Sequence, residues 1–271
     1  MNKVPFALHI ETKEYVDVHD VERGRKCKCI CPSCDTPLTA RQGDVNEWHF
    51  AHATRGTSEE TKQDCKFSFY VSVTQMAKQL FAEKQQLDLA LPDFVYTVKE
   101  LHPISGGRLS KDVTVTLASD AVLEDVKLEA TWKSLKGDVL GLVHGVPLII
   151  GFHHPERKYE IEVGNLEGLE GERVGVLRVD LTETLKLFYN KKQRSQQPFK
   201  ERLDEYIFSD RTNLEWLYHP RLPSYAATAR EELMRELSTR ADTTPYGNRK
   251  PSRGDFIDRA LAGFSLNRPR R

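Results

Sequence analysis

The sequence predicts an α+β protein with a small β-rich N-terminal module, a mixed β-sheet with flanking helices, and a helical C-terminal extension. All five cysteines lie within the first 65 of the 271 residues. Short β-prone runs recur between residues 94 and 181, and helical patterns follow. We therefore expect domains at 1–66, 67–182 and 183–240, and a basic, flexible tail at 241–271.

The N-terminal module begins with a predicted hairpin. Val4 to Ile10 and Tyr15 to Val18 have the composition of short strands, and the polar segment Glu11 to Glu14 separates them as a turn. A third strand is expected to begin near Arg25.

The cysteines and histidines of this module have the spacing of a metal site. Cys31 and Cys34 form a CxxC pair, which in a tight turn places two thiolates on one zinc ion. His49, His52 and Cys65 follow, and any two of these three complete four-fold coordination. The sequence therefore predicts a structural zinc site of the Cys3His or Cys2His2 type.

The two histidines are not equivalent in this prediction. If the segment around them is extended, His49 and His52 point to opposite faces, so only one ligates easily. We favour His52. Strand alternation would also place Cys27 and Cys29 on the same side as Cys31, where one of them could compete for the metal. We interpret Cys27 and Cys29 as packing residues.

A long amphipathic helix is predicted from Phe67 to Gln86, with apolar residues near a 3.6-residue period and no Gly or Pro. A sheet is expected next. His144-Gly145 separates two of its runs and predicts a hairpin, and the second of these runs is apolar enough for a strand buried on both faces. The runs are Phe94–Val98, Val113–Leu117, Val126–Leu128, Val139–Val143, Val146–Phe152 and Val174–Leu181.

Helices are predicted after residue 181. Thr182 is a candidate N-cap for a helix over Thr184 to Tyr189, Pro198 opens a second helix that runs to Phe208, and a third spans Tyr225 to about Arg240. Residues 243–248 form a breaker cluster that we interpret as a linker. From residue 240 to the end, eight basic residues face three acidic ones, a net charge of +5.

Several of these motifs together resemble the N-terminal zinc-finger region of competence protein CoiA-like proteins. The residues that carry the resemblance are the Cys31 to Cys34 turn, Gly43, the His49-Phe50-Ala51-His52 tetrapeptide, Cys65 and Ala77-Lys78. It continues more faintly through Leu181, with a further echo at Trp216 to Pro220, and Thr74 stands where the family has a histidine. The resemblance implies that residues 67–182 form a nuclease-like domain of the PD-(D/E)xK type, with a restriction-endonuclease-like core.

A nuclease site of that type needs two acids that bind Mg²⁺ or Mn²⁺ and a lysine near the attacking water. Asp138 fits the first acid, because it opens the apolar strand that starts at Val139. On the neighbouring strand no acid is present: Ile149 or Gly151 occupies that place.

Alternative acids exist outside that strand. Glu156 and Lys158 match the ExK pattern, but they follow Pro155 and lie beyond the apolar run. Glu129 is another candidate acid, contributed by the preceding strand. The alternative interpretation of these charged residues is a solvated surface, and His153 and His154 are interpreted as a turn rather than as metal ligands or a general base.

Composition limits the class of protein. The chain carries 40 basic and 40 acidic residues and has a pI near 7.1, so it is not polybasic overall, although the tail is. No apolar run approaches the roughly 20 residues of a membrane-spanning helix, and no secretory signal pattern is visible at the N-terminus. We expect a cytoplasmic protein.

Three functions remain open at this point. The first is an active metal-dependent DNA endonuclease that uses Asp138, Glu156 and Lys158. The second, which fits the missing acid better, is a degenerate nuclease-fold zinc protein that binds DNA, a protein partner or both in handling foreign or mobile DNA. The third is a zinc-stabilised interaction module without a nucleic-acid role.

Overall fold

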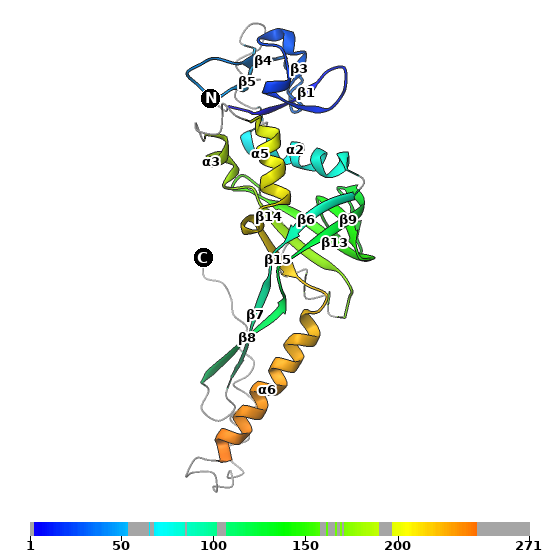
Figure 1. The fold of residues 1–271 in the computed structure, drawn as a ribbon, viewed down its shortest axis with the longest axis vertical. Helices are drawn as coiled ribbons and strands as arrows, with labels where there is room; N and C mark the ends of the chain where they lie inside the picture. Colours follow the sequence, from blue (N-terminus) through cyan, green and yellow to red (C-terminus); the bar gives the residue numbers. More distant parts are fainter. Residues whose placement is uncertain are drawn as a thin grey trace. The chain divides into compact units, whose positions relative to one another are not determined.

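The structure of the chain is a computed structural model that describes residues 3–53, 65, 68–84, 86–101, 107–157, 161, 166, 169, 171–189 and 197–242. Figure 1 shows the fold, with most of the helices and strands labelled. Two compact units are present: Met1–Tyr96 with Val113–Tyr225, and Thr97–Asp112 with the chain from Ala226 on. The first unit contains the cysteine-rich module and the main sheet, and both the metal centre and the pocket described below lie within it.

The N-terminal module is built from a three-stranded antiparallel sheet and a separate two-stranded hairpin. β1 (Phe6–His9) pairs with β2 (Tyr15–Asp17), which confirms the first predicted hairpin. β3 (Cys29–Ile30) pairs with the other edge of β1. β4 (Leu38–Arg41) and β5 (His49–His52) form the second hairpin.

The segment before β3 differs from the predicted strand. Residues Arg25–Cys27 form a short 3₁₀ turn, η2, and Lys28 has a left-handed backbone with a φ of 51°. That conformation interrupts an extended chain, so Cys27 is not on the strand that carries Cys29. The expectation of three alternating cysteines on one strand is therefore wrong.

Helix α2 (Phe69–Glu83) confirms the long predicted helix. The Ser68 hydroxyl accepts the backbone N–H of Val71 at 3.3 Å and caps its first turn. The helix ends earlier than expected, because β6 (Gln86–Leu91) follows almost at once. This strand was not predicted, since its alternating leucines directly continue the apolar pattern of the helix.

A six-stranded mixed sheet forms the centre of the first unit, in the order β15-β14-β13-β12-β9-β6. β13 and β14 are parallel, and the other neighbours are antiparallel. The strands not yet given bounds are β9 (Ser119–Leu128), β12 (Val139–Val143), β13 (Val146–His153), β14 (Gly175–Asp180) and β15 (Leu214–Tyr218). The predicted mixed α+β class is confirmed.

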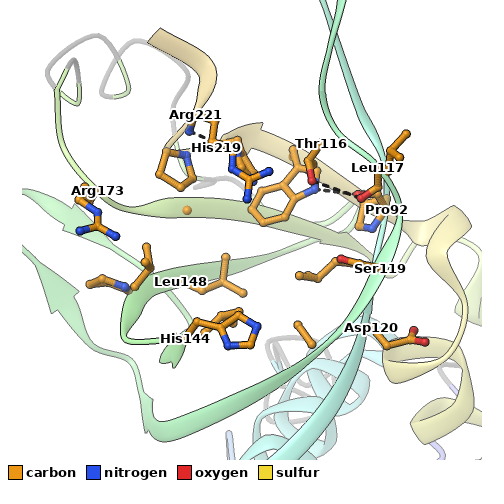
Figure 2. Close-up of a pocket in the computed structure, with 18 residues that line it drawn as sticks. Pro92, Thr116, Leu117, Ser119, Asp120, His144, Leu148, Arg173, His219 and Arg221 are labelled. Carbon is orange, nitrogen blue, oxygen red and sulfur yellow. Dashed lines mark hydrogen bonds between the residues drawn. The ribbon is translucent and has the colours of Figure 1, made fainter. Parts of the chain in front are cut away.

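The hairpin between β12 and β13 forms where it was predicted. Both residues of its tight turn have positive φ, 50° at His144 and 73° at Gly145, as the tight turns that match strand twist require. A pocket lies beside the first residues of β13 and β14, and Figure 2 shows it in close-up.

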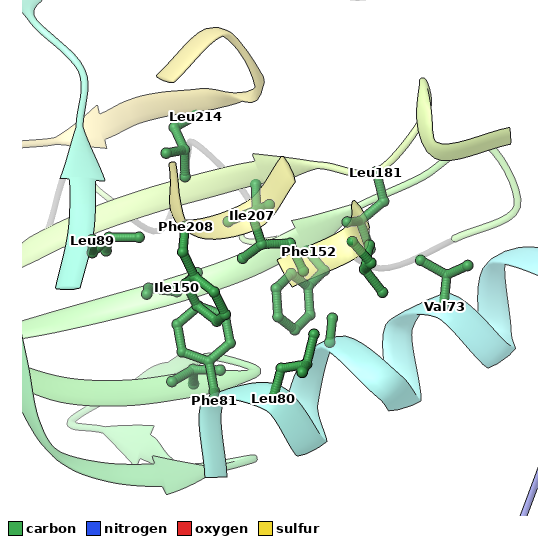
Figure 3. Close-up of a cluster of buried hydrophobic side chains, with 14 of the residues drawn as sticks. Val73, Leu80, Phe81, Leu89, Ile150, Phe152, Leu181, Ile207, Phe208 and Leu214 are labelled. Carbon is green, nitrogen blue, oxygen red and sulfur yellow. The ribbon is translucent and has the colours of Figure 1, made fainter. Parts of the chain in front are cut away.

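The core lies between one face of the sheet and helices α2 and α5 (Phe199–Phe208). Figure 3 shows Phe81 and Leu80 from α2 and Phe208 from α5 against Ile150 and Phe152 of β13. A second cluster around Ile149 covers the opposite face. β13 is therefore buried on both faces, as predicted from its continuous apolar run.

The segment after residue 181 is only partly the helical extension that was expected. α3 (Thr184–Phe188), α5 and α6 (Leu222–Asp242) confirm the three predicted helices. However, β15 joins the edge of the main sheet beside β14. The N-cap of α3 is Glu183 and not Thr182. β15 was missed because its five residues were too short a run to separate from the helices around it.

The remaining elements are not strands of the six-stranded sheet. The expected linker and basic tail at 243–271 lie outside the described residues. Within the described part of the chain, no helix is both long and apolar enough to cross a membrane. The elements outside the six-stranded sheet that have not yet been given bounds are β7 (Phe94–Leu101), β8 (Arg108–Thr116), β10 (Thr131–Trp132), β11 (Leu135–Lys136), η1 (Val18–Asp20) and η4 (Arg211–Asn213).

Candidate metal centre

The CxxC segment forms a tight turn between β3 and β4. The Cys31 N–H donates to the Thr36 carbonyl at 3.0 Å, and the Asp35 N–H donates back to the Cys31 carbonyl at 2.9 Å. Asp35 has a φ of 53°, in the left-handed region that Asp tolerates better than most residues. This turn brings the thiols of Cys31 and Cys34 to the same side of the chain.

Four side chains converge beside this turn. The ligand atoms of Cys31, Cys34, His52 and Cys65 all lie within 4.8 Å of one another. Cys31 Sγ is 3.4 Å from Cys65 Sγ, and Cys34 Sγ is 3.4 Å from His52 Nε2. The β4–β5 hairpin supplies His52 from the last position of β5.

This donor set fits zinc. Four ligands at the usual Zn–S and Zn–N distances stand about 3.5 to 3.8 Å apart at the corners of a tetrahedron, close to the separations found here. The sulfur atoms of Cys31 and Cys65 are too far apart for a disulfide, and all five cysteines are free. The four residues could therefore hold a structural zinc ion in a Cys3His site.

The surroundings favour ligation at two of the four positions. Burial lowers the pKa of His52, which keeps its imidazole neutral, as a zinc ligand must be. Burial is the largest single influence on Cys34 and raises its pKa, but hydrogen bonds with Thr36 and with the thiols of Cys31 and Cys65 together outweigh it, so the pKa is lowered overall. Burial raises the pKa of Cys31, a cost that zinc binding would offset.

The other candidate ligands lie outside this group. His49 is buried, and its Nδ1 donates to the Glu47 carbonyl at 2.7 Å. The Cys29 thiol donates to the Cys27 carbonyl at 3.1 Å, and the Cys27 thiol donates to the Leu38 carbonyl at 3.4 Å. These residues pack in the core of the module.

Asp138, the first acid of the predicted nuclease site, is held by cations of the protein itself. Arg157 makes a two-pronged ion pair with it, with Nη1 2.6 Å from Oδ2 and Nη2 3.0 Å from Oδ1. Lys78 Nζ is 3.2 Å from Oδ1, and the Phe152 N–H donates to Oδ2 at 2.8 Å. Asp138 is only 5% exposed.

These contacts set the charge state of Asp138. Burial is the largest influence and raises the pKa of the carboxyl, but Arg157, the Phe152 amide and Lys78 together hold it below its ordinary value. Lys78 also lies 2.9 Å from Glu129, so one ammonium group serves both candidate acids. The carboxylate is thus ionised, buried and already neutralised without a metal ion.

Glu156, the second predicted catalytic acid, contacts the start of α2. The Ser68 hydroxyl at the start of α2 donates to the Glu156 carboxylate. His153 is the last residue of β13, and the buried ring of His154 stacks on Tyr70 with a centroid distance of 5.3 Å. Lys158 lies outside the described residues. In the described part of the chain, the Cys3His group is the one set of three or more metal-ligand side chains.

Sequence reasoning missed the residues that neutralise Asp138. Arg157 is the free central position of the Glu156-Arg157-Lys158 pattern, and Lys78 appeared only as part of the Ala77-Lys78 pair. A signal for Arg157 was available in the sequence. It follows shortly after β13, and because β12 and β13 are antiparallel, the end of β13 lies beside the start of β12, where Asp138 stands.

The comparison with known families concerns the N-terminal module. Residues 14–67 match the family model described as Competence protein CoiA, N-terminal domain, a range that includes all four residues of the Cys3His group. The CoiA-like resemblance is thereby confirmed for this module. No curated protein and no solved structure matches the chain.

Proposed function

We propose that this CoiA-like chain is a zinc-bearing, DNA-binding protein in the handling of foreign or mobile DNA, whose nuclease-like domain no longer cuts DNA. The observation that carries the proposal is the ion pair between Asp138 and Arg157. A nuclease of the PD-(D/E)xK type would use this carboxylate to bind a divalent metal, and here a guanidinium takes up both of its oxygens.

The neighbouring strand supports the same conclusion. The Asp138 N–H donates to the Ile150 carbonyl at 3.0 Å, which aligns the start of β12 with the middle of β13. The second acid of a nuclease would be expected on this part of β13, where Ile149 and Gly151 stand. Ile149 is buried in the second apolar cluster, and neither residue offers an oxygen ligand from its side chain.

The meander β9-β12-β13 followed by the parallel strand β14 is the strand arrangement that a restriction-endonuclease-like core would need. We infer that the domain derives from such a nuclease and keeps its fold, while Asp138 and Glu129 now form ion pairs that stabilise this fold. Fold alone carries no activity, so DNA binding has to come from specific basic surfaces.

The basic turn η2 of the module is one such surface. Arg23, Arg25, Lys26 and Lys28 are all exposed, within six residues that precede Cys31 in the chain. Lys28 pairs with Glu11 at 2.8 Å, an exposed contact that phosphate could replace. Residues 240–271, with their net charge of +5, would add contacts that do not depend on DNA sequence.

The catalytic part of the proposal is tested with purified full-length protein, plasmid DNA and Mg²⁺ or Mn²⁺. We expect no cleavage above that of the Asp138→Ala variant. Cleavage that Asp138→Ala abolishes would show instead an active metal-dependent endonuclease, with Glu156 and Lys158 as the next residues to substitute.

The binding part is tested by fluorescence anisotropy with a labelled duplex over a salt series. We expect affinity to fall steeply with salt. The double substitution Arg23→Gln, Lys26→Gln should weaken binding by about tenfold and should reduce the number of counterions released on binding, read from the slope of log affinity against log salt, by about two. Arg108→Gln on β8 is the matched control. Absence of binding at low salt would favour a zinc-stabilised protein-interaction module.

A further inference from the structure

A pocket of about 550 Å³ lies in the first unit, at the end of the sheet opposite to Asp138. Its walls come from the start of β13, the start of β14 and the end of β15. β13 runs from Val146 at the pocket to Phe152, whose N–H binds Asp138. The strand separates the two sites, so nothing in the nuclease-like centre accounts for this pocket.

One wall of the pocket is a fixed aromatic ring. The Trp216 indole N–H donates to the Pro92 carbonyl at 2.9 Å, which holds the ring on the sheet. Gly175 on β14 makes room for it, because a Cβ at this position would stand 3.1 Å from Trp216 Cζ3 and 2.9 Å from Leu148 Cδ1. Trp216 lines the pocket although it is only 7% exposed, so it offers an apolar contact to the ring of a ligand.

The charges of the pocket are unbalanced. Figure 2 shows Arg173 and Arg221 at one end of the pocket and Asp120 at the other. Asp120 is paired with Arg211, whereas the guanidinium groups of Arg173 and Arg221 have no ion-pair partner among the residues that the structure describes. Two unpaired guanidinium groups at one end of a pocket favour an anion with several oxygens.

A neutral hydrogen-bond donor lies beside them. His219 Nδ1 accepts the Arg221 backbone N–H at 3.1 Å, so the ring carries its proton on Nε2. His219 is 9% exposed, and burial followed by the charge of Arg221 lowers its pKa to about 4. It therefore stays a neutral donor that costs no charge repulsion with the two arginines.

We propose that this pocket binds a nucleoside phosphate, with the phosphate group on Arg173 and Arg221 and the base against Trp216. The volume lies within the usual range for small-ligand sites, which begins near 300 Å³. A free mononucleotide and the phosphorylated end of a DNA strand share this chemistry. The proposal is independent of duplex binding by the basic turn η2.

The test is isothermal titration of the full-length protein with dAMP, deoxyadenosine and inorganic phosphate, and with a single-stranded hexanucleotide with and without a 5′-phosphate. We expect dAMP or the phosphorylated hexanucleotide to bind at least about tenfold more tightly than deoxyadenosine or phosphate alone. Binding of dAMP identifies a free nucleotide, and binding of the phosphorylated hexanucleotide alone identifies a strand end.

The variants Arg173→Gln and Arg221→Gln should each weaken that binding by about tenfold, the usual effect of losing one charge-assisted hydrogen bond. Both side chains are exposed, so folding is expected to be unaffected, and Arg108→Gln is the matched control. The proposal is overturned if neither phosphorylated ligand binds, if phosphate alone binds as tightly, or if both variants bind like the control. Binding of dAMP by a protein that fails to bind duplex DNA would leave this inference intact and reject the proposed function.

Discussion

Asp17, the last residue of β2, caps helix α5 through Lys200. Its Oδ2 accepts the Lys200 N–H at 2.7 Å. The residue at the N-cap position of α5 is Pro198, whose side chain cannot accept a hydrogen bond, so Asp17 supplies the acceptor instead. Asp17 Oδ1 accepts from the backbone N–H and Nδ1 of His19, at 2.9 and 2.8 Å. Asp17 is fully buried. The N-terminal module and helix α5 therefore share one carboxylate, and the stability of each depends on the other.

Asp17→Ala is expected to destabilise the whole first unit, because it removes a helix cap and leaves buried donors without an acceptor. The loss should be about 2 kcal/mol in the free energy of unfolding, measured by urea denaturation. Glu22→Ala, an exposed acid of the same module, is the control. An equal effect of the two substitutions would mean that the cap contributes nothing.

Zinc content should distinguish the two histidines of β5. We expect about one zinc per chain in the purified protein and in His49→Gln, because His49 donates to a carbonyl away from the group. His52→Gln and Cys34→Ser should retain much less zinc after dialysis, since each removes one of four ligands. Elemental analysis of the four proteins checks this. Loss of zinc from His49→Gln alone would reject the ligand set.

Removal of zinc by a chelator should expand the module and lower the melting temperature of the whole first unit. The reason is that its strands are short and its Cys31 thiol is buried, so the metal supplies much of its stability. The measurement is thermal unfolding by circular dichroism with and without chelator. Cys34→Ser should unfold at the lower temperature under both conditions, and a chelator effect that persists in this variant would point to a different site.

Asp138 should stabilise the fold in a pH-dependent way. Its pKa is lowered in the folded protein, so the unfolded chain binds the proton more readily. The stabilisation is present above the ordinary pKa of an aspartate, near 4, and is lost as the pH falls below that value. Asp138→Asn should lower stability on the order of 2 kcal/mol at pH 7 and less at pH 3, because it leaves Arg157 without its carboxylate partner and Lys78 with Glu129 alone. Urea unfolding at both values tests this, and an equal loss at both would contradict it.

His219 should reduce stability in mildly acidic solution. Its pKa is about 4 in the folded protein and about 6.5 in the unfolded chain, so the unfolded chain gains protons first as the pH falls. Stability should therefore decline between about pH 6.5 and 4 by on the order of 3 kcal/mol. His219→Asn keeps an acceptor for the Arg221 N–H and should flatten this decline. His144→Asn, at the exposed turn of the same pocket, should leave it unchanged, and a decline of the same size in His219→Asn would reject the assignment.

Local patterns explain why much of the fold could be predicted. The β12–β13 hairpin depends on two adjacent residues with positive φ, and α2 depends on a long apolar period with a serine cap. Both signals lie within a few residues of the elements they specify. β6 and β15 were missed because short strands acquire their hydrogen bonds from partners far away in the chain.

By itself, the sequence determined the ligand chemistry of the metal centre, since a CxxC turn and a hairpin ending in histidine bring donors together through local geometry. Strand alternation indicated that only one of His49 and His52 would ligate, and the placement of His52 against Cys34 required the hairpin to pack on the turn. Only the tertiary structure decided which groups pair with the Asp138 carboxylate. Its ionic partners, Lys78 and Arg157, lie 60 residues before and 19 residues after it, and only the packing of α2 and the turn after β13 brings them to one carboxylate.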